Sequence, residues 1–166
     1  MTHIEKAPKN FHARYSPIGK TYFYHLHLDR VQDPFKRLHS LHVKKKIDLD
    51  LLREATKVLI GTHDFTSFAN ENHRGSVSID PIRTLKRISI VEEIGGIRLE
   101  LEADGFLYRM VRNIVGTLLE VAKGKYSIED LQQMLMAKDR AKAGKGAPPH
   151  ALFLAEVYYP KYESCK

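Results

Sequence analysis

The spacing of hydrophobic positions along the chain predicts several strands. Residues 20–28 (KTYFYHLHL) alternate with a period of two, which is the repeat of a strand with two different faces. One predicted face carries four large side chains: Tyr22, Tyr24, Leu26 and Leu28. Residues 83–94 and 97–103 predict a hairpin, because the second segment alternates cleanly and Gly95-Gly96 separates the two. Residues 151–159 (ALFLAEVYY) predict a final strand.

Two further segments carry helix start signals. Asp48 is a predicted N-cap, since hydrophobic residues follow it at helical spacing up to Leu59, and Gly61 is expected to stop that helix. Ser127-Ile-Glu-Asp130 resembles a capping box with Asp in place of the usual Glu. It predicts a short helix that runs to about Lys138.

Residues 104–116 (DGFLYRMVRNIVG) open a hydrophobic helical pattern that reaches about Ala122. Advancing 100° per residue from Leu107 gathers the apolar side chains in one arc. Arg109 falls nearly opposite the centre of that arc, where solvent or a phosphate would meet it. Arg112 falls at its edge, which predicts a half-buried side chain suited to pairing with a carboxylate. Both charges have the wrong sign for a helix N-terminus, so they call for a functional explanation.

The predicted order is strand, helix, strand, strand, helix, helix, strand. This order predicts an α+β fold with a mainly antiparallel sheet and helices packed on one face. The polar segment 29–46 and the basic segment 139–150 are expected to be loops, and 61–82 is a mixed stretch. No internal repeat or domain boundary is visible in the 166 residues.

The chain is basic, with a formal charge of +7 and a pI of about 9.4. This favours a polyanionic partner such as nucleic acid without fixing one. The one cysteine, Cys165, excludes an internal disulfide and favours a reducing compartment. We expect a cytoplasmic protein without a membrane partner, because the sequence has no signal-peptide pattern and no apolar run long enough to span a bilayer.

Familiar catalytic motifs are missing from the sequence. The nine histidines show no metal-ligand spacing, GKGAPP at 144–149 lacks the frame of a phosphate-binding loop, and there is no G-x-S-x-G elbow. Asp64, in HDFTSF, is open to two interpretations: a catalytic carboxylate, or the cap of a turn that Phe65 and Phe68 anchor in the core. We favour the turn.

Four motifs in order give the sequence a family resemblance. They are FHARYSPIGKTYFY (11–24), GTHDFTSF (61–68), DGFLYRMVRNIVGTLLEV (104–121) and APPHALFLAEVYYP (147–160). Together they resemble the C-terminal half of TruA-type tRNA pseudouridine synthases, with Ala151 in place of the glycine usual in the last motif.

The resemblance implies a pseudouridine synthase fold and isomerisation of uridine to pseudouridine in the tRNA anticodon arm, without a cofactor; the histidine spacing already argues against a metal site. Tyr22 matches the aromatic residue that stacks on the target base, and Arg112 matches the basic partner of a nucleophilic aspartate. The implied partners are tRNA and a second copy of the chain in a homodimer. The basic residues expected to bind RNA are Arg14, Lys20, Arg83, Arg109 and Arg140.

One departure from the family pattern changes the expectation. The family aspartate lies in G-R-T-D-x-G-V-H-A, upstream of F-H-A-R, and that segment does not occur here. We therefore expect residues 11–166 to be a C-terminal domain that is inactive alone, with 1–10 the remnant of an interdomain strand and linker. The missing N-terminal catalytic domain would then be an intramolecular partner. The alternatives are a non-catalytic RNA-binding module on the same scaffold, or a purely structural dimerisation domain.

Overall fold

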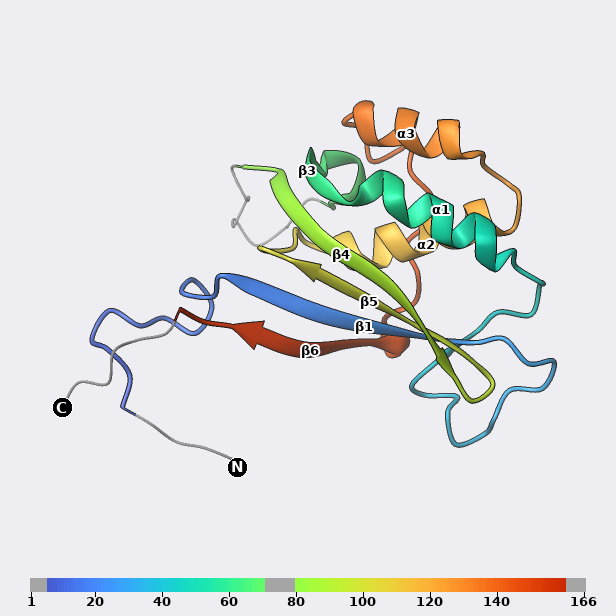
Figure 1. Cartoon of the computed structure of the whole chain (residues 1–166), viewed down its shortest axis with the longest axis horizontal. Helices are drawn as coiled ribbons and strands as arrows, with labels where there is room; N and C mark the ends of the chain where they lie inside the picture. Colours follow the sequence, from blue (N-terminus) through green and yellow to red (C-terminus); the bar gives the residue numbers. More distant parts are fainter. Residues whose placement is uncertain (1–5, 71–79, 161–166) are drawn as a thin grey trace.

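The computed structural model describes residues 6–70 and 80–160 (Figure 1). Its three helices all lie on one side of a single sheet (Figure 1). The strands are β1 (Gly19–His27), β2 (Leu41–His42), β3 (Gly61–Asp64), β4 (Ile82–Glu93), β5 (Gly96–Ala103) and β6 (Leu152–Tyr158). The helices are α1 (Leu49–Leu59), α2 (Met110–Ala122) and α3 (Ile128–Met136), with 3-10 turns at Thr66–Phe68 and Pro149–Ala151. The predicted α+β class is confirmed.

The sheet is mainly antiparallel, as predicted. Its order is β2-β1-β5-β4-β3, and β6 also pairs with β1. Both β6 and β2 lie along the same edge of β1: β6 pairs with Gly19–Tyr24, and β2 continues in parallel from Leu26. The predicted hairpin is β4–β5, with Gly95 in the left-handed region at its tip. β1 is therefore a central strand that β5 and β6 hold on its two sides.

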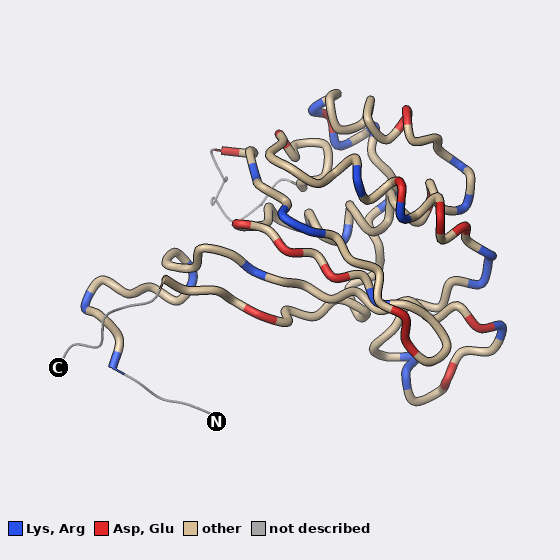
Figure 2. Tube along the Cα trace, viewed as in Figure 1, with Lys and Arg blue, Asp and Glu red and all other residues tan. Residues whose placement is uncertain are grey.

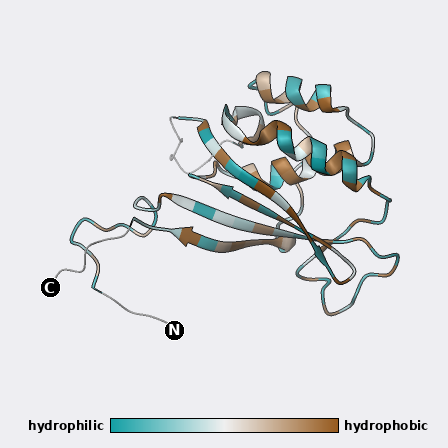
Figure 3. Ribbon diagram, viewed as in Figure 1, coloured by the Kyte–Doolittle hydropathy of each residue, from teal (hydrophilic) through white to brown (hydrophobic). Residues whose placement is uncertain are grey.

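Hydrophobic residues of the sheet face the helices, and charged residues occupy the opposite face. The hydropathy colours alternate along β4 and β5 (Figure 3), and basic residues of β4 lie beside acidic residues of β5 (Figure 2). On this charged face, Arg98 pairs with Glu93 at 2.8 Å and with Glu100 at 2.7 Å. On the opposite face, β1 contributes Tyr24 and Leu26 to the core, where both side chains are almost completely buried. The charged face of the sheet is thus turned toward solvent, and the apolar face forms one core with the helices.

Local capping explains where the two shorter helices start. The Asp48 side chain accepts hydrogen bonds from the backbone N–H groups of Asp50 and Leu51, so the predicted N-cap is confirmed. Ser127 and Asp130 form the predicted reciprocal capping box, at 2.8 and 3.0 Å.

The structure adds two strands to the sequence-based prediction and moves the start of a third. The segment expected to be a loop contains the short strand β2, and the mixed stretch contains β3, which pairs with β4. The last strand starts at Leu152 rather than at residue 151, because a 3-10 turn precedes it. In the part of the chain that the structure describes, no helix combines the length and the hydrophobicity needed to cross a membrane.

Candidate active site

β1 presents two tyrosines on the face that packs against α2 and the segment before it. Tyr22 is partly exposed, and its ring meets the ring of Phe106 edge-on, with centroids 5.2 Å apart and planes at 89°. Tyr24, two residues along the strand, is fully buried, and its hydroxyl donates to the carbonyl oxygen of Pro148 at 2.8 Å. Part of the Tyr22 side chain is therefore accessible, whereas the Tyr24 side chain is buried and held by its hydrogen bond.

Arg112 lies in the first turn of α2 and is half-buried, as the hydrophobic pattern predicted. Its Nε donates to the carbonyl oxygen of Ala147 at 2.7 Å, and the Ala147 N–H donates back to the Arg112 carbonyl at 2.8 Å. Within residues 6–70 and 80–160, no carboxylate pairs with Arg112 and its two Nη atoms have no hydrogen-bond partner. The guanidinium is thus held at one edge and keeps two parallel donors, the arrangement that grips a carboxylate bidentately.

Arg112 lies near the buried Tyr24, because the two side chains donate to the carbonyl oxygens of the adjacent residues Ala147 and Pro148. Burial raises the pKa of Tyr24 well above its usual value, and the positive charge of Arg112 acts in the opposite direction. Burial also raises the pKa of Tyr22. Both hydroxyls therefore stay protonated at neutral pH, so neither tyrosine neutralises the guanidinium.

The structure corrects the placement of Arg109. The helix begins at Met110, so Leu107 and Arg109 precede it rather than forming part of its first turns. Arg109 is the N-cap residue, with φ 60° in the left-handed region, and its side chain makes no capping bond. It is exposed and lies over the Tyr108 ring, 5.2 Å from the centroid. The expected exposure is confirmed, but its cause is the turn before the helix and not the far side of a helical wheel.

The other predicted RNA-binding residues differ in their exposure and in the hydrogen bonds that their side chains already make. Arg14 is exposed in the turn that follows Phe11, and Lys20 is partly exposed in β1. Arg83 donates to the backbone oxygens of residues 80 and 82, which fixes part of its guanidinium. Arg140 points inward: it donates to Asn113 Oδ1 at 3.0 Å and to the Ala143 carbonyl at 3.3 Å. The predicted RNA contacts of all four stay predictions, and the hydrogen bonds of Arg140 already use part of its guanidinium.

The hydrophobic pattern gave no role to Asn113, yet this side chain joins three segments. It is 2% exposed, and its Nδ2 donates to the Phe68 carbonyl at 2.7 Å and to Asn70 Oδ1 at 2.8 Å. Its Oδ1 accepts from Arg140. On the same helical wheel Asn113 falls outside the apolar arc, between Arg109 and Met110, so the hydrophobic spacing gave no signal of its burial. Its three partners satisfy the requirement that a buried polar side chain is hydrogen-bonded.

Asp64 caps a turn, in agreement with the interpretation that we favoured. Its Oδ1 accepts from the backbone N–H and the hydroxyl of Thr66, at 3.0 and 2.6 Å, while Phe65 and Phe68 are fully buried. Lys138 pairs with its other oxygen at 3.1 Å. Burial alone would raise the pKa of Asp64, but the hydrogen bonds from Thr66 and the contact with Lys138 outweigh it and lower the pKa. Asp64 is thus an occupied structural acceptor.

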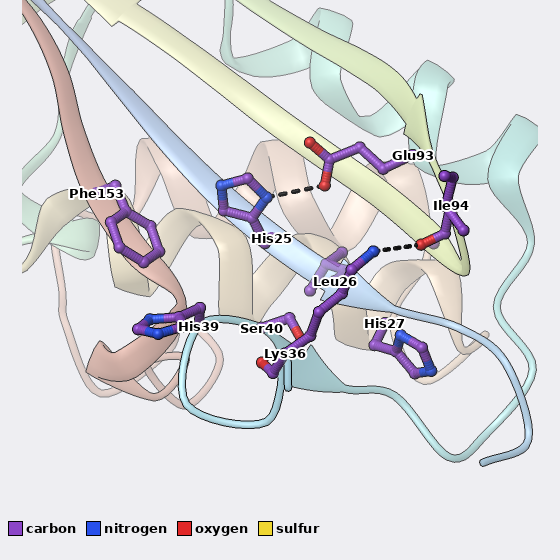
Figure 4. A pocket seen from close by; sticks show the side chains of 10 residues that line it. His25, Leu26, His27, Lys36, His39, Ser40, Glu93, Ile94 and Phe153 are labelled. Carbon is purple, nitrogen blue, oxygen red and sulfur yellow. Dashed lines mark hydrogen bonds and ion pairs between the residues drawn. The ribbon is translucent and has the colours of Figure 1, made fainter. Parts of the chain in front are cut away.

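A separate pocket of about 580 Å³ opens near the far end of β1 (Figure 4). Its walls include His25, His39 and Phe153, but neither Tyr22 nor Arg112. His25 is bonded to Glu93 at 2.8 Å, and the Lys36 ammonium donates to the Ile94 carbonyl at 2.8 Å (Figure 4). Most polar groups of this pocket are therefore already used. Among the described residues, no group of three or more His, Cys, Asp or Glu side chains could hold a metal ion.

Comparison with known proteins points to one family. A family model described as tRNA pseudouridine synthase matches residues 55–160. A "tRNA pseudouridine synthase A 1" of Protochlamydia amoebophila is 52% identical over 162 residues, and the match covers 98% of this chain and 63% of the relative. The "tRNA pseudouridine synthase A" of Bacillus subtilis is 42% identical, with 93% and 62% covered, and that of Chlamydia muridarum is 44% identical, with 92% and 56% covered. The chain thus spans less than two thirds of the length of these relatives.

Proposed function

The chain belongs to the tRNA pseudouridine synthase family, and from that premise we propose that it is the C-terminal domain of an enzyme that isomerises uridine to pseudouridine in the tRNA anticodon arm. The proposal assigns residues 11–166 to this domain and residues 1–10 to the remnant of an interdomain strand and linker. It places the reaction in the cytoplasm, with tRNA as substrate and a homodimer as the working assembly.

One observation carries the catalytic part of the proposal: the anchored guanidinium of Arg112 has two unused Nη donors within the described residues. A carboxylate supplied by another segment would form a bidentate ion pair there, which keeps it ionised and oriented. Tyr22 supplies an aromatic face for a uracil ring that has left its stack. Tyr22 and Arg112 belong to the same region of the fold, because Tyr22 shares a strand face with Tyr24, and Tyr24 and Arg112 donate to the carbonyl oxygens of the adjacent residues Pro148 and Ala147.

The reaction breaks the bond between N1 of uracil and C1′ of ribose and joins C5 to C1′, with loss of the C5 proton and gain of a proton at N1. Neither Tyr22 nor Arg112 is a nucleophile for this exchange, since both are charged or protonated donors at neutral pH. Asp64 is already occupied by Thr66 and Lys138. The proposal therefore requires an aspartate from a segment of the G-R-T-D type, and it makes the present chain inactive alone.

Tritium release from 5-tritiated uridine in tRNA tests this function. The chain alone is expected to release none, whereas a fusion to a family N-terminal half that carries the aspartate is expected to release tritium. A correctly folded fusion without activity would count against the assignment. Release by the chain alone would overturn the argument for an external nucleophile.

The alternative function is a non-catalytic RNA-binding module. The isolated chain and the fusion also distinguish this alternative from the proposed enzyme. Such a module binds tRNA as this chain alone and gains no isomerase activity in the fusion, which fluorescence anisotropy with labelled tRNA and tritium release together reveal. Sedimentation velocity of the fusion tests the proposed homodimer, and a monomer at all concentrations would remove that part of the proposal.

A further inference from the structure

An extended segment lies directly along α2 beside Arg112. Residues Gly144–Pro148, here called the strap, follow the helix from its middle toward its first turn. The Gly144 N–H donates to Thr117 Oγ1 at 3.1 Å, and at the other end Ala147 exchanges backbone hydrogen bonds with Arg112. Beyond Ala147, the Pro148 carbonyl accepts from Tyr24. The strap therefore joins the helix to β1 at the point where the guanidinium emerges.

Small residues make this close approach possible. A Cβ on Gly116 would overlap the Lys145 carbonyl oxygen, and a Cβ on Gly146 would come within 2.6 Å of Asn113 Oδ1. A Cβ on Gly144 would meet the Thr117 side chain at 3.0 Å. The separations at Gly116 and Gly146 are shorter than real Cβ atoms show, and the one at Gly144 is unusually tight. The strap therefore lies this close to the helix because glycines line the contact.

Two buried polar side chains of α2 hold the strap in register. Thr117 accepts from Gly144 and donates its own hydroxyl proton to the Asn113 carbonyl at 2.8 Å. The Asn113 side chain, fixed by Phe68, Asn70 and Arg140, forms the wall against which Gly146 rests. Both side chains are almost fully buried, so shifting either leaves a polar group without a partner.

We propose that the strap and its two contacts on α2, Thr117 and Asn113, are positioning elements that hold the Arg112 guanidinium in place before a carboxylate arrives. The proposal rests on the proposed function, in which Arg112 is the partner of the nucleophilic aspartate. A free arginine side chain samples many rotamers, and the bond from Nε to Ala147 removes that freedom at the outermost torsions. The Nη pair then keeps one direction, and no ordering cost remains when the carboxylate binds.

The test measures the Arg112 geometry without RNA. The Nε–H of Arg112 is followed by ¹⁵N NMR in the present chain, and its exchange with water reports the bond to Ala147. Gly146→Ala is the first variant, because Gly146 is an exposed loop residue whose added methyl group pushes the strap from Asn113. Its matched control is Gly105→Ala, where the added Cβ meets the nearest atom at an ordinary 3.4 Å. We expect about tenfold faster exchange in Gly146→Ala and no change in the control.

A second pair separates positioning from general packing. Thr117→Val keeps the shape of the side chain but leaves the Gly144 N–H without its acceptor, whereas Thr117→Ser keeps the hydroxyl. Faster exchange in the valine variant and recovery in the serine variant support the proposal; if the valine variant does not fold, the Gly146 pair decides. Unchanged Nε–H exchange in Gly146→Ala, or equal acceleration in its control, overturns the positioning role. Failure of the tritium assay would overturn the catalytic role of Arg112 and leave this measurement unaffected.

Discussion

Arg112 and Ala147 are 35 residues apart in sequence and share two hydrogen bonds, one from the Arg112 Nε to the Ala147 carbonyl and one from the Ala147 N–H to the Arg112 carbonyl. The backbone of a distant segment therefore holds the Arg112 side chain at its Nε atom. A positive charge in the first turn of a helix opposes the helix dipole, and this double contact offsets part of that cost. The arrangement makes Arg112 a rigid donor rather than a mobile surface charge.

The first prediction concerns Arg112→Ala in the fusion that supplies the aspartate. We expect kcat for tritium release to fall by about a hundredfold or more, because the carboxylate loses a semi-buried partner. The Kd for tRNA should change by about threefold or less, because contacts with phosphates supply most of the binding free energy and Arg112 pairs with a carboxylate instead. Arg112→Lys is the matched control and should recover little activity, because an ammonium has neither the Nε nor the paired donors. Equal losses in kcat and affinity would show that Arg112 only contacts a phosphate.

The second prediction concerns Arg109, which is exposed and lacks a capping role. Arg109→Ala should weaken tRNA binding by a few-fold and reduce the slope of log affinity against log salt by about one, the signature of one lost phosphate contact. The turnover of bound tRNA by the fusion should stay the same. Anisotropy titrations at several salt concentrations measure the slope. A large loss of turnover with unchanged affinity would place Arg109 in the reaction instead.

Local signals in the sequence predicted much of this fold. The N-cap at Asp48, the capping box at Ser127 and the Gly95 hairpin were predicted correctly because each needs contacts within a few residues. The half-buried position of Arg112 followed from the helical period alone. Such features depend on residues close together in the chain, so a single sequence is enough to predict them.

The start of α2 shows where the pattern misled. Leu107 is buried and fits the helical period, yet it lies in the turn before the helix, where its carbonyl accepts from the Met110 N–H. Burial at that position comes from the turn folding back on the core, which mimics one more helical step. The backbone of Arg109 then takes a left-handed conformation, which hydrophobic periodicity does not encode.

The supporting contacts of the site could not be predicted because they are distant in sequence. Asn113 reaches Phe68, Asn70 and Arg140 across 45, 43 and 27 residues. β3 was missed for a related reason, since its polar residues become a strand only by pairing with β4. Tertiary pairing, not local preference, decides these features.

The third prediction uses the left-handed backbone of Arg109, with φ 60°. Arg109→Gly should be more stable to urea than Arg109→Ala by about 1 kcal/mol, because only glycine adopts this conformation without a Cβ penalty. Both variants lose the same charge, so the comparison isolates the backbone. The free energies of unfolding come from urea titrations followed by circular dichroism. An alanine variant as stable as the glycine variant would mean that the turn relaxes to another conformation.

The last prediction concerns Asp64 and the pH dependence of stability. Its folded pKa lies below the ordinary value of 3.8, so at acid pH the unfolded state binds more protons than the folded state. The ionised carboxylate therefore stabilises the fold at neutral pH, and this contribution is lost as the pH falls from the ordinary value through the lowered folded pKa. Asp64→Asn should be less stable at pH 7 and should lose less further stability on acidification than the unsubstituted chain.

Urea midpoints measured from pH 7 to about pH 3 test this expectation over the range in which carboxyl groups titrate. Lys138→Met is the control, because it removes the 3.1 Å ion pair and keeps both hydrogen bonds from Thr66. Its acid sensitivity should fall between those of the other two proteins, since the Thr66 bonds still favour the ionised form. Parallel pH curves for all three proteins would show that the Asp64 carboxyl has the same pKa in the folded and unfolded chain.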